Sequence, residues 1–120
     1  MFQLNHKKAV VTGGGSGIGK AICKVLAQQG ATVYVIDINQ EQASETVAEI
    51  GQEKAIAHAL DVTNQQATIA LFEKIGAIDI LVNCAGISHI GNAINTHEAD
   101  FEKVFQVNVK GVYNCLHAGI

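Results

Sequence analysis

The sequence predicts an α/β protein built on a doubly wound parallel sheet, and three observations support this. A glycine-rich turn at residues 13–19 joins a short apolar run to a segment with helical periodicity. Short apolar runs then alternate with amphipathic segments along the 120-residue chain. An acidic residue, Asp37, ends the second apolar run eighteen residues after Gly19. Together these features indicate a Rossmann-type arrangement.

The first unit is a strand, a glycine turn and a helix. Residues 9–11 suit a buried strand, and the helical periodicity follows at four apolar positions, Ile18, Ile22, Val25 and Leu26. Gly30 is placed to end this helix. Glycines permit a tight turn and a close approach of backbone N–H groups to a phosphate. The helix adds unpaired amides and its positive dipole end, so we expect the turn to bind the diphosphate of a dinucleotide.

The second unit begins with a strand over residues 32–37, which is apolar on both faces, as in a parallel strand covered by helices. Asp37 ends it, and an acid at this distance accepts hydrogen bonds from the adenosine ribose. An alternative is that the segment from Asp37 to Asn39 caps the next helix. That helix covers residues 40–50 and ends at Gly51. Its inward residues are Ala43, Val47 and Ile50, and its solvent row is Glu41, Glu45 and Glu49.

Two further strands are expected, at residues 55–60 and 79–83, with a helix at 64–75 between them. Gly76 ends that helix, and its buried side is expected to comprise Ile69, Leu71, Phe72 and Ile75. The sequence Asp61-Val62-Thr63 follows the third strand, and Asp61 or Thr63 is an alternative helix cap. The predicted strand order is 3-2-1-4, the first half of a doubly wound sheet.

A loop at residues 87–96 contains Ser88, His89, Gly91 and Asn92 and is expected to lie where a substrate would enter. A helix then begins near Thr96, with Glu98 and Asp100 suited to its first turn. Its apolar face comprises Phe101, Val104, Phe105, Val109 and Val112. We expect part of this face, and the outer edge of the fourth strand, to lack a cover within residues 1–120.

The composition argues against several functional classes. The formal net charge is −3 and arginine is absent, which gives no support for binding nucleic acid or an anionic membrane. The apolar runs are too short to span a membrane, and no signal-peptide pattern begins the chain, so we expect a cytoplasmic protein. Three widely spaced cysteines (Cys23, Cys84 and Cys115) suit reduced, buried thiols, and the five histidines lack metal-ligand spacing.

The glycine turn reads Thr12-Gly13-x-x-x-Gly17-x-Gly19, and this pattern resembles the short-chain dehydrogenase/reductase family. The resemblance implies that Gly13, Ser16, Gly17, Ile18 and Gly19 hold the cofactor diphosphate, and that Asp37 binds the adenosine ribose. A 2′-phosphate beside Asp37 would be repelled by about 1 kcal/mol in water and about 4 kcal/mol at an effective dielectric near 20. Family members that use NADP carry a basic residue where this chain has Ser16 or Ile38. We therefore expect NAD rather than NADP.

The same resemblance assigns further residues. Asp61 and Val62 would hold the adenine ring. The segment from Asn83 through Ala85 to Gly86 resembles the family's N-N-A-G, with Cys84 in place of its second Asn. Asn108 begins an N-x-x-G segment and corresponds to the supporting Asn of the family's catalytic Asn-Ser-Tyr-Lys set, where a local helix distortion holds a water. An exposed polar position without a role is the alternative for Asn108.

The family's Tyr-x-x-x-Lys pair does not occur in residues 1–120. The residue four positions after Tyr34 is Ile38, and the residue four positions after Tyr113 is His117. We therefore expect a truncated NAD(P)-binding domain that is inactive alone, from an enzyme acting on small alcohols or carbonyl compounds. The family commonly forms dimers or tetramers through the last helix seen here and the next one. Alternatives are a non-catalytic NAD-binding or sensing module and a scaffold that binds nothing.

Overall fold

The computed structural model describes residues 3–86 and 96–119, and it confirms the predicted fold class and strand order. Four parallel strands form one sheet in the order β3-β2-β1-β4. These strands are β1 (Lys8–Thr12), β2 (Thr32–Asp37), β3 (Ala55–Ala59) and β4 (Ile80–Asn83). The helical elements are α1 (Gly17–Gln28), α2 (Gln40–Ile50), α3 (Gln65–Ile75), α4 (Glu98–Phe105), the π-helical η1 (Gln106–Lys110) and α5 (Gly111–Gly119).

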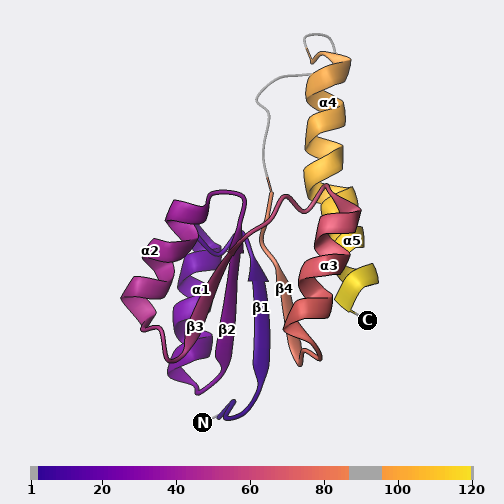
Figure 1. Ribbon diagram of the computed structural model, residues 1–120. Helices are drawn as coiled ribbons and strands as arrows, with labels where there is room; N and C mark the ends of the chain where they lie inside the picture. Colours follow the sequence, from indigo (N-terminus) through magenta and orange to yellow (C-terminus); the bar gives the residue numbers. More distant parts are fainter. Residues whose placement is uncertain (1–2, 87–95, 120) are drawn as a thin grey trace.

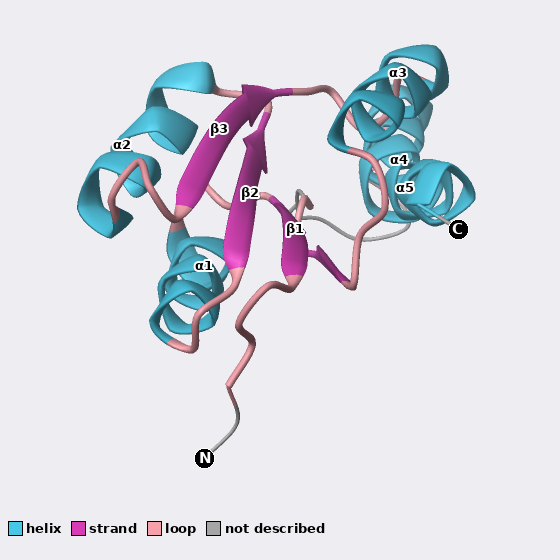
Figure 2. Ribbon diagram, turned by 60° about the horizontal axis from the view of Figure 1, so that its bottom comes forward, coloured by secondary structure: helices cyan, strands magenta, loops and turns pink. Residues whose placement is uncertain are grey.

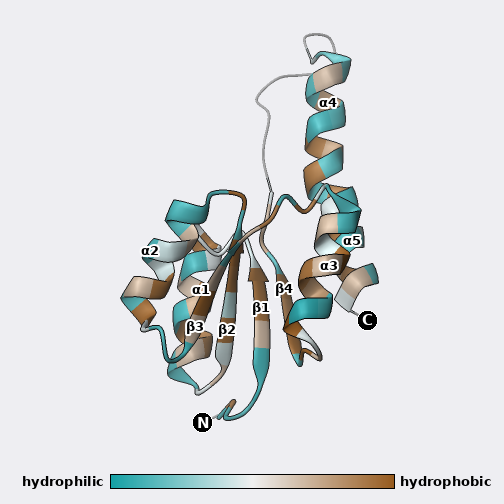
Figure 3. Cartoon of the chain, viewed as in Figure 1, coloured by the Kyte–Doolittle hydropathy of each residue, from teal (hydrophilic) through white to brown (hydrophobic). Residues whose placement is uncertain are grey.

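Helices flank the sheet on both sides, with α1 and α2 against one face and α3 and α5 against the other (Figures 1 and 2). Successive strand residues alternate between the two cores. Val11, Val33 and Val35 pack with Cys23 and Ala43 on the α1 and α2 side. On the other side the core comprises Val10, Ile36, Leu60, Val62, Phe72, Ile75 and Cys115. The strand interiors are accordingly hydrophobic in Figure 3.

Asparagine side chains cap two helices. Asn39 Oδ1 accepts from the Gln42 amide at 3.0 Å, and Asn64 Oδ1 accepts from the Ala67 amide at 3.0 Å. Asn39 belongs to the segment 37–39, the alternative cap of the first of these helices, and Asn39 rather than Asp37 provides that cap. The alternative in which Asp61 or Thr63 caps the next helix is wrong, because Asn64, directly before that helix, fills the position. The start expected at Thr96 is also shifted, since His97 is the N-cap residue of α4.

The fully buried positions of α1 are small residues, which corrects the predicted face at two of its four positions. Ile18 is 76% exposed and Val25 is 54% exposed, whereas Gly19, Cys23 and Ala27 are buried. A Cβ atom at Gly19 would overlap the carbonyl oxygen of Gly13. The helix therefore lies too close to the turn for a side chain at position 19. Ile22 and Leu26 are partly buried and pack against this core, as predicted.

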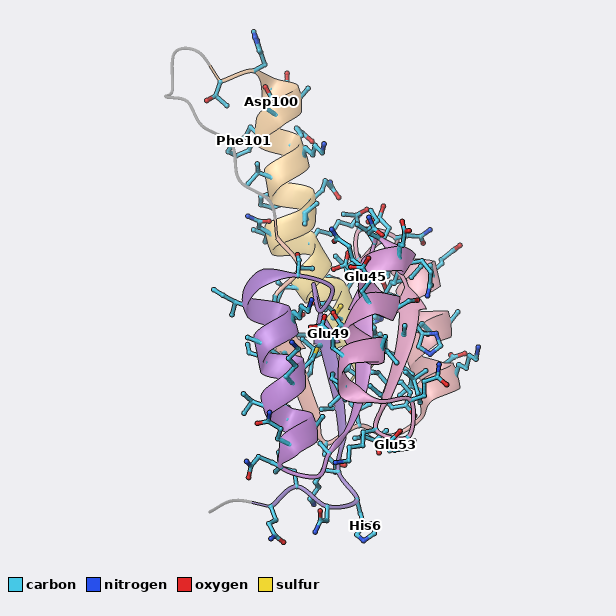
Figure 4. The ribbon with its side chains drawn as sticks, turned by 90° about the vertical axis from the view of Figure 1, so that its left-hand side faces the viewer. His6, Glu45, Glu49, Glu53, Asp100 and Phe101 are labelled. Atoms are coloured by element: carbon cyan, nitrogen blue, oxygen red, sulfur yellow. The ribbon has the colours of Figure 1, made fainter. Side chains whose placement is uncertain are left out.

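The C-terminal helix is continuous but changes its winding at η1, where Asn108 lies. The predicted local distortion is thus present as a π-helical turn. Within the described residues, the apolar face of this helix is largely uncovered, as expected. Phe101, Phe105 and Val109 are exposed, as are Tyr113 and Leu116 further along. Figure 4 shows Phe101 near the far end of α4, away from the sheet.

Helix α2 is linked to the rest of the fold by polar contacts. The hydroxyl of Thr46, which is fully buried, donates to the carbonyl of Gly14 at 3.0 Å. Glu49 forms ion pairs with Lys20 and Lys24 of α1, whereas Glu45 points to solvent (Figure 4). Because Glu49 is exposed and its two lysine partners are only half-buried, these pairs contribute little, and the buried Thr46 bond fixes α2 against the glycine turn.

We predict that Thr46→Val lowers the free energy of unfolding by about 1–3 kcal/mol, because the Gly14 carbonyl loses its buried donor while the side-chain volume is kept. Urea unfolding followed by circular dichroism measures the change. Ser44→Ala, on the exposed side of α2, is the control and should change stability by less than about 0.5 kcal/mol. Equal stability of the two variants would contradict the assigned role of Thr46.

Candidate functional site

A cleft of about 710 Å³ lies where the strands end and their connections begin. Ligands of open parallel sheets bind at this carboxyl edge. Nine of the predicted site residues line the cleft: Gly13, Ser16, Ile18, Gly19, Asp37, Asp61, Val62, Ala85 and Gly86. The turn after β1 and the ends of β2, β3 and β4 are thus brought to one place.

The glycine turn forms one wall of the cleft. Gly13 has φ +67°, and a Cβ there would lie 2.7 Å from the carbonyl carbon of Cys84. Gly17 has φ +56°, and a Cβ on it would stand in open space. The N-cap position of α1 is Ser16, whose side chain makes no capping bond, and the amide of Lys20 makes the first helical bond to its carbonyl. The amides of residues 17–19 therefore precede the helical ladder, as an anion site requires.

Thr12 joins the glycine turn to the end of β4. Its buried Oγ1 accepts from the amides of Cys84 and Ala85, both at 3.2 Å. The Cys84 amide also donates to the Thr12 carbonyl at 3.2 Å. This hydroxyl continues the pairing of β1 with β4 beyond the last register pair, which joins Thr12 to Asn83. Thr12 is the first residue of the glycine-turn pattern, but the sequence analysis did not predict that its hydroxyl binds the end of β4.

Asp37 lies at the cleft and not at a helix cap. Its Oδ2 accepts from the Gly15 amide at 3.0 Å and its Oδ1 accepts from the Asn39 amide at 3.0 Å. The carboxylate is thereby fixed between the glycine turn and the start of α2. Each oxygen keeps a second lone pair, so the group can also accept from ligand hydroxyls.

Asp61 and Val62 form the cleft wall at the end of β3. Asp61 Oδ1 accepts from both the amide and the hydroxyl of Thr63, at 3.0 and 2.7 Å. Asp61 is exposed, whereas Val62 is buried in the core that contains Phe72 and Cys115. The turn therefore presents a carboxylate beside an apolar surface, which suits a heterocycle with an exocyclic amine.

The remaining predicted residues lie around the end of β4. Asn83 is its last residue and is half-buried, but it does not line the cleft, and neither does Gly17. Asn108 is an exposed residue of η1, and its Oδ1 lies 3.3 Å from the position of a Cβ on Gly86. The structure thus brings Asn108 to the end of β4. The expected loop residues Ser88, His89, Gly91 and Asn92 lie outside the described residues.

Sequence reasoning missed several lining residues. They are Thr12, Ile36, Ile38, Gln42, Leu60, Cys84, Lys103 and Val107. Ile38 is 73% exposed at the rim. Lys103 and Val107 come from the C-terminal helix, and their i, i+4 spacing, which places them on one helix face, was the available signal. Among the described residues that line the cleft, Lys103 is the one cation, and Asp37 and Asp61 are the carboxylates.

The cysteines differ in their surroundings. Cys23 and Cys115 are buried, and desolvation raises the pKa of the Cys23 thiol to about 12 and the pKa of the Cys115 thiol to about 11. Cys84 is half-buried and lines the cleft. All three thiols are free, and no metal-binding cluster occurs among residues 3–86 and 96–119. In the same ranges, no helix has the length and apolarity to cross a membrane.

Comparison with known proteins identifies the family. A family model described as short chain dehydrogenase matches residues 7–120. The chain belongs to the short-chain dehydrogenase family. Its similarity to individual members covers nearly all of this chain. Cyclopentanol dehydrogenase from Comamonas sp. (strain NCIMB 9872) is 37% identical over 119 residues, which cover 94% of this chain and 48% of that protein.

Other family members agree with this assignment. The 3-oxoacyl-[acyl-carrier-protein] reductase FabG of Thermotoga maritima is 38% identical, with 94% of this chain and 48% of that protein covered. The crystal structure of 3-ketoacyl-(acyl-carrier-protein) reductase from Brucella melitensis complexed with NADH superposes with a TM-score of 0.90 at 38% identity. That match covers 96% of this chain and 49% of the reductase. The chain thus spans about half the length of the curated relatives it matches.

We predict that iodoacetamide at pH 8 alkylates Cys84 first in the native short-chain dehydrogenase chain. The raised pKa values keep Cys23 and Cys115 protonated at this pH, and burial blocks access to them, so both react only after unfolding. Peptide mass spectrometry of samples quenched over time measures the three rates. Alkylation of Cys23 as fast as that of Cys84 would contradict the described packing, and a sample in urea provides the fully reactive reference.

Proposed function

We propose that this chain forms the NAD-binding part of an oxidoreductase that transfers a hydride between an alcohol or carbonyl substrate and nicotinamide. The main support for this proposal is that the glycine turn, Asp37 and Asp61 line the same cleft. The relatives named above are dehydrogenases and reductases, which supports an enzyme over a sensing module. The NADH named for the Brucella reductase supports the nicotinamide cofactor.

The residues present fit a dinucleotide. The open space at Gly17 and the amides of residues 17–19 suit a diphosphate, which carries the negative charge that a helix N-terminus favours. Asp37 suits the ribose hydroxyls. Asp61 and Val62 suit the adenine amine and ring. These assignments follow the order of the lining residues along the sheet edge, from β1 through β2 to β3.

NAD is favoured over NADP because Asp37 is held firmly in place. Two backbone amides fix its carboxylate, so the side chain would not easily turn away from a 2′-phosphate. Its neighbours Ser16 and Ile38 offer no compensating positive charge. The like-charge repulsion would therefore oppose NADP at this position.

When bound, the nicotinamide supplies a carbon that accepts or donates the hydride. The chain's own contribution near that reaction is Asn108. The π-helical turn places this side chain beside Gly86, at the end of β4, where its carboxamide can hold a water for proton transfer. Residues 1–120 contain no Tyr-x-x-x-Lys pair to take the substrate proton.

The uncovered apolar face of α4, η1 and α5 supports a homo-oligomer, either a dimer or a tetramer. Phe101, Phe105 and Val109 are exposed on it, and exposed apolar area of this kind is commonly covered in an assembly. Figure 3 shows hydrophobic positions alternating with hydrophilic ones along α4. A cytoplasmic location and the absence of nucleic-acid partners stay predictions.

We predict that NADH binds the chain and that Gly17→Trp reduces its affinity at least about tenfold, because the indole would fill the space beside the turn. Asp37→Arg should reverse the preference, with weaker NADH binding and stronger NADPH binding, because the repulsion becomes an attraction. Titration followed by cofactor fluorescence measures the NADH affinity of the wild-type chain and both variants, and the NADPH affinity of the wild-type chain and Asp37→Arg. Glu45→Gln, on the solvent side of α2, is the control. Unchanged NADH affinity in both site variants would remove the cofactor from the proposed place.

We predict that the 120-residue chain reduces NAD with simple alcohols no faster than a protein-free blank. The expected reason is the lack of a Tyr and Lys pair to accept the alcohol proton. Absorbance at the NADH band, recorded with cyclopentanol and sorbitol as probes, measures the rate. Robust turnover that is lost in Gly17→Trp would contradict this prediction and would require another base within residues 1–120.

A further inference from the structure

Asn114 is a fully buried polar residue of α5, with 0% relative exposure. A buried carboxamide is costly unless both its oxygen and its nitrogen are hydrogen-bonded. The other buried polar side chains of the described chain are threonines, namely Thr12, Thr46 and Thr68. The sequence analysis assigned Asn114 no role. The hydrogen bonds that offset the cost of burying its carboxamide indicate which part of the fold this residue holds.

Both of its bonds lead to the segment that follows β3. Asn114 Nδ2 donates to the carbonyl of Val62 at 2.8 Å, in a buried bond. Gln65 Nε2 donates to Asn114 Oδ1 at 3.1 Å. The bond from Gln65 orients the carboxamide, because it commits the oxygen and leaves the nitrogen facing Val62. Asn114 therefore joins α5 to the turn between β3 and α3.

The same face of α5 touches the side chain of Val62. A Cβ on Gly111, one helical turn before Asn114, would lie 2.5 Å from Val62 Cγ2. Residues three apart lie on one helix face, so Gly111 and Asn114 contact one target together. The glycine lets the helix approach, and the asparagine binds the carbonyl. Val62 is thus held through both its side chain and its backbone.

Asp61 is the residue directly before this contact. Its Oδ1 accepts from the amide and the hydroxyl of Thr63, two residues away, so these bonds stiffen the turn without tying it to the rest of the fold. Two long-range bonds hold the segment on either side of Asp61. The Leu60 amide donates to the Asp37 carbonyl at 3.0 Å, and the Val62 carbonyl accepts from Asn114, fifty-two residues further along the chain. A shift of Val62 would therefore carry the neighbouring carboxylate with it.

We propose that Asn114 is a positioning residue for adenine recognition. It fixes the Val62 carbonyl and thereby places the Asp61 carboxylate where it accepts a hydrogen bond from the exocyclic amine of adenine. The inference rests on the proposed NAD site and adds the residue that sets its base selectivity. Asn114 does not line the cleft, so it acts through Val62 and not by touching the cofactor.

Selectivity between two cofactors tests this role separately from fold stability. Nicotinamide hypoxanthine dinucleotide carries a carbonyl oxygen where NAD has the adenine amine, so this position cannot donate to Asp61 and instead places an acceptor against the carboxylate. The reduced forms of both are titrated against the 120-residue chain by their fluorescence. The wild-type chain should bind NADH about tenfold more tightly than the hypoxanthine analogue, as expected for one hydrogen bond to a charged group.

Asn114→Leu removes both bonds at similar volume, and the preference for NADH should fall to less than about threefold. Thr68→Val is the matched control. Thr68 is also fully buried and polar, but its hydroxyl donates to the Asn64 carbonyl and not to Val62. This control should lose stability and keep the tenfold preference. A purely structural role for Asn114 would weaken both cofactors equally and leave their ratio unchanged.

If Asn114→Leu does not fold, Asn114→Ser replaces it, because its shorter side chain loses the direct bond while water can reach the Val62 carbonyl. A tenfold preference that persists in the folded Asn114 variant overturns the inference and leaves the NAD site intact. A wild-type chain that binds neither cofactor overturns the proposed function, and one that binds both equally overturns the adenine assignment of Asp61 and with it the inference.

Discussion

The close approach between the turn after β1 and the end of β4 is the constraint on which the site depends. At Gly13 the two backbones are so near that a single Cβ would clash with Cys84 and Ala85. The Thr12 hydroxyl then holds the same two residues through their amides. The cleft can form because two central strands end together, and because the residue between them has no side chain.

The C-terminal helix connects separate parts of this cleft. Its π-helical turn brings Asn108 to Gly86 at the end of β4, while Gly111 and Asn114 contact Val62 at the end of β3. Lys103 and Val107 of the same helix line the cleft. One helix therefore sets the distance between the proposed catalytic end of the cleft and its proposed adenine end. A π-helical turn in such a helix is frequently associated with a functional site.

The charge distribution in the cleft depends on backbone amides as well as on the charged side chains. Asp37 and Asp61 place two carboxylates on one wall, and each accepts hydrogen bonds from nearby amides. The start of α1 opposes them with unpaired amide donors, which suit a diphosphate without requiring a basic residue in the turn. This separation would let neutral hydroxyls and an amine meet the acids while the anionic part of a dinucleotide meets the helix.

The sequence by itself determined the parallel sheet, its strand order and most of the cleft. Glycine spacing, apolar runs and an acid at a fixed distance are local signals, and each reports on its own strand or turn. The caps at Asn39 and Asn64, and the small residues of α1 that face the sheet, depended on which neighbour packs where. The caps were ambiguous in the sequence because carboxylates and hydroxyls that can also cap a helix lie within three residues of Asn39 and Asn64.

Only the tertiary structure decided the contributions of Lys103, Val107 and Asn114. These residues lie far along the chain from the strands they approach, and the direction of a long helix relative to a sheet follows from packing. The bond from Asn114 to the Val62 carbonyl illustrates the reason. A buried carboxamide has to be hydrogen-bonded, but only the fold determines which backbone group accepts its hydrogen bond.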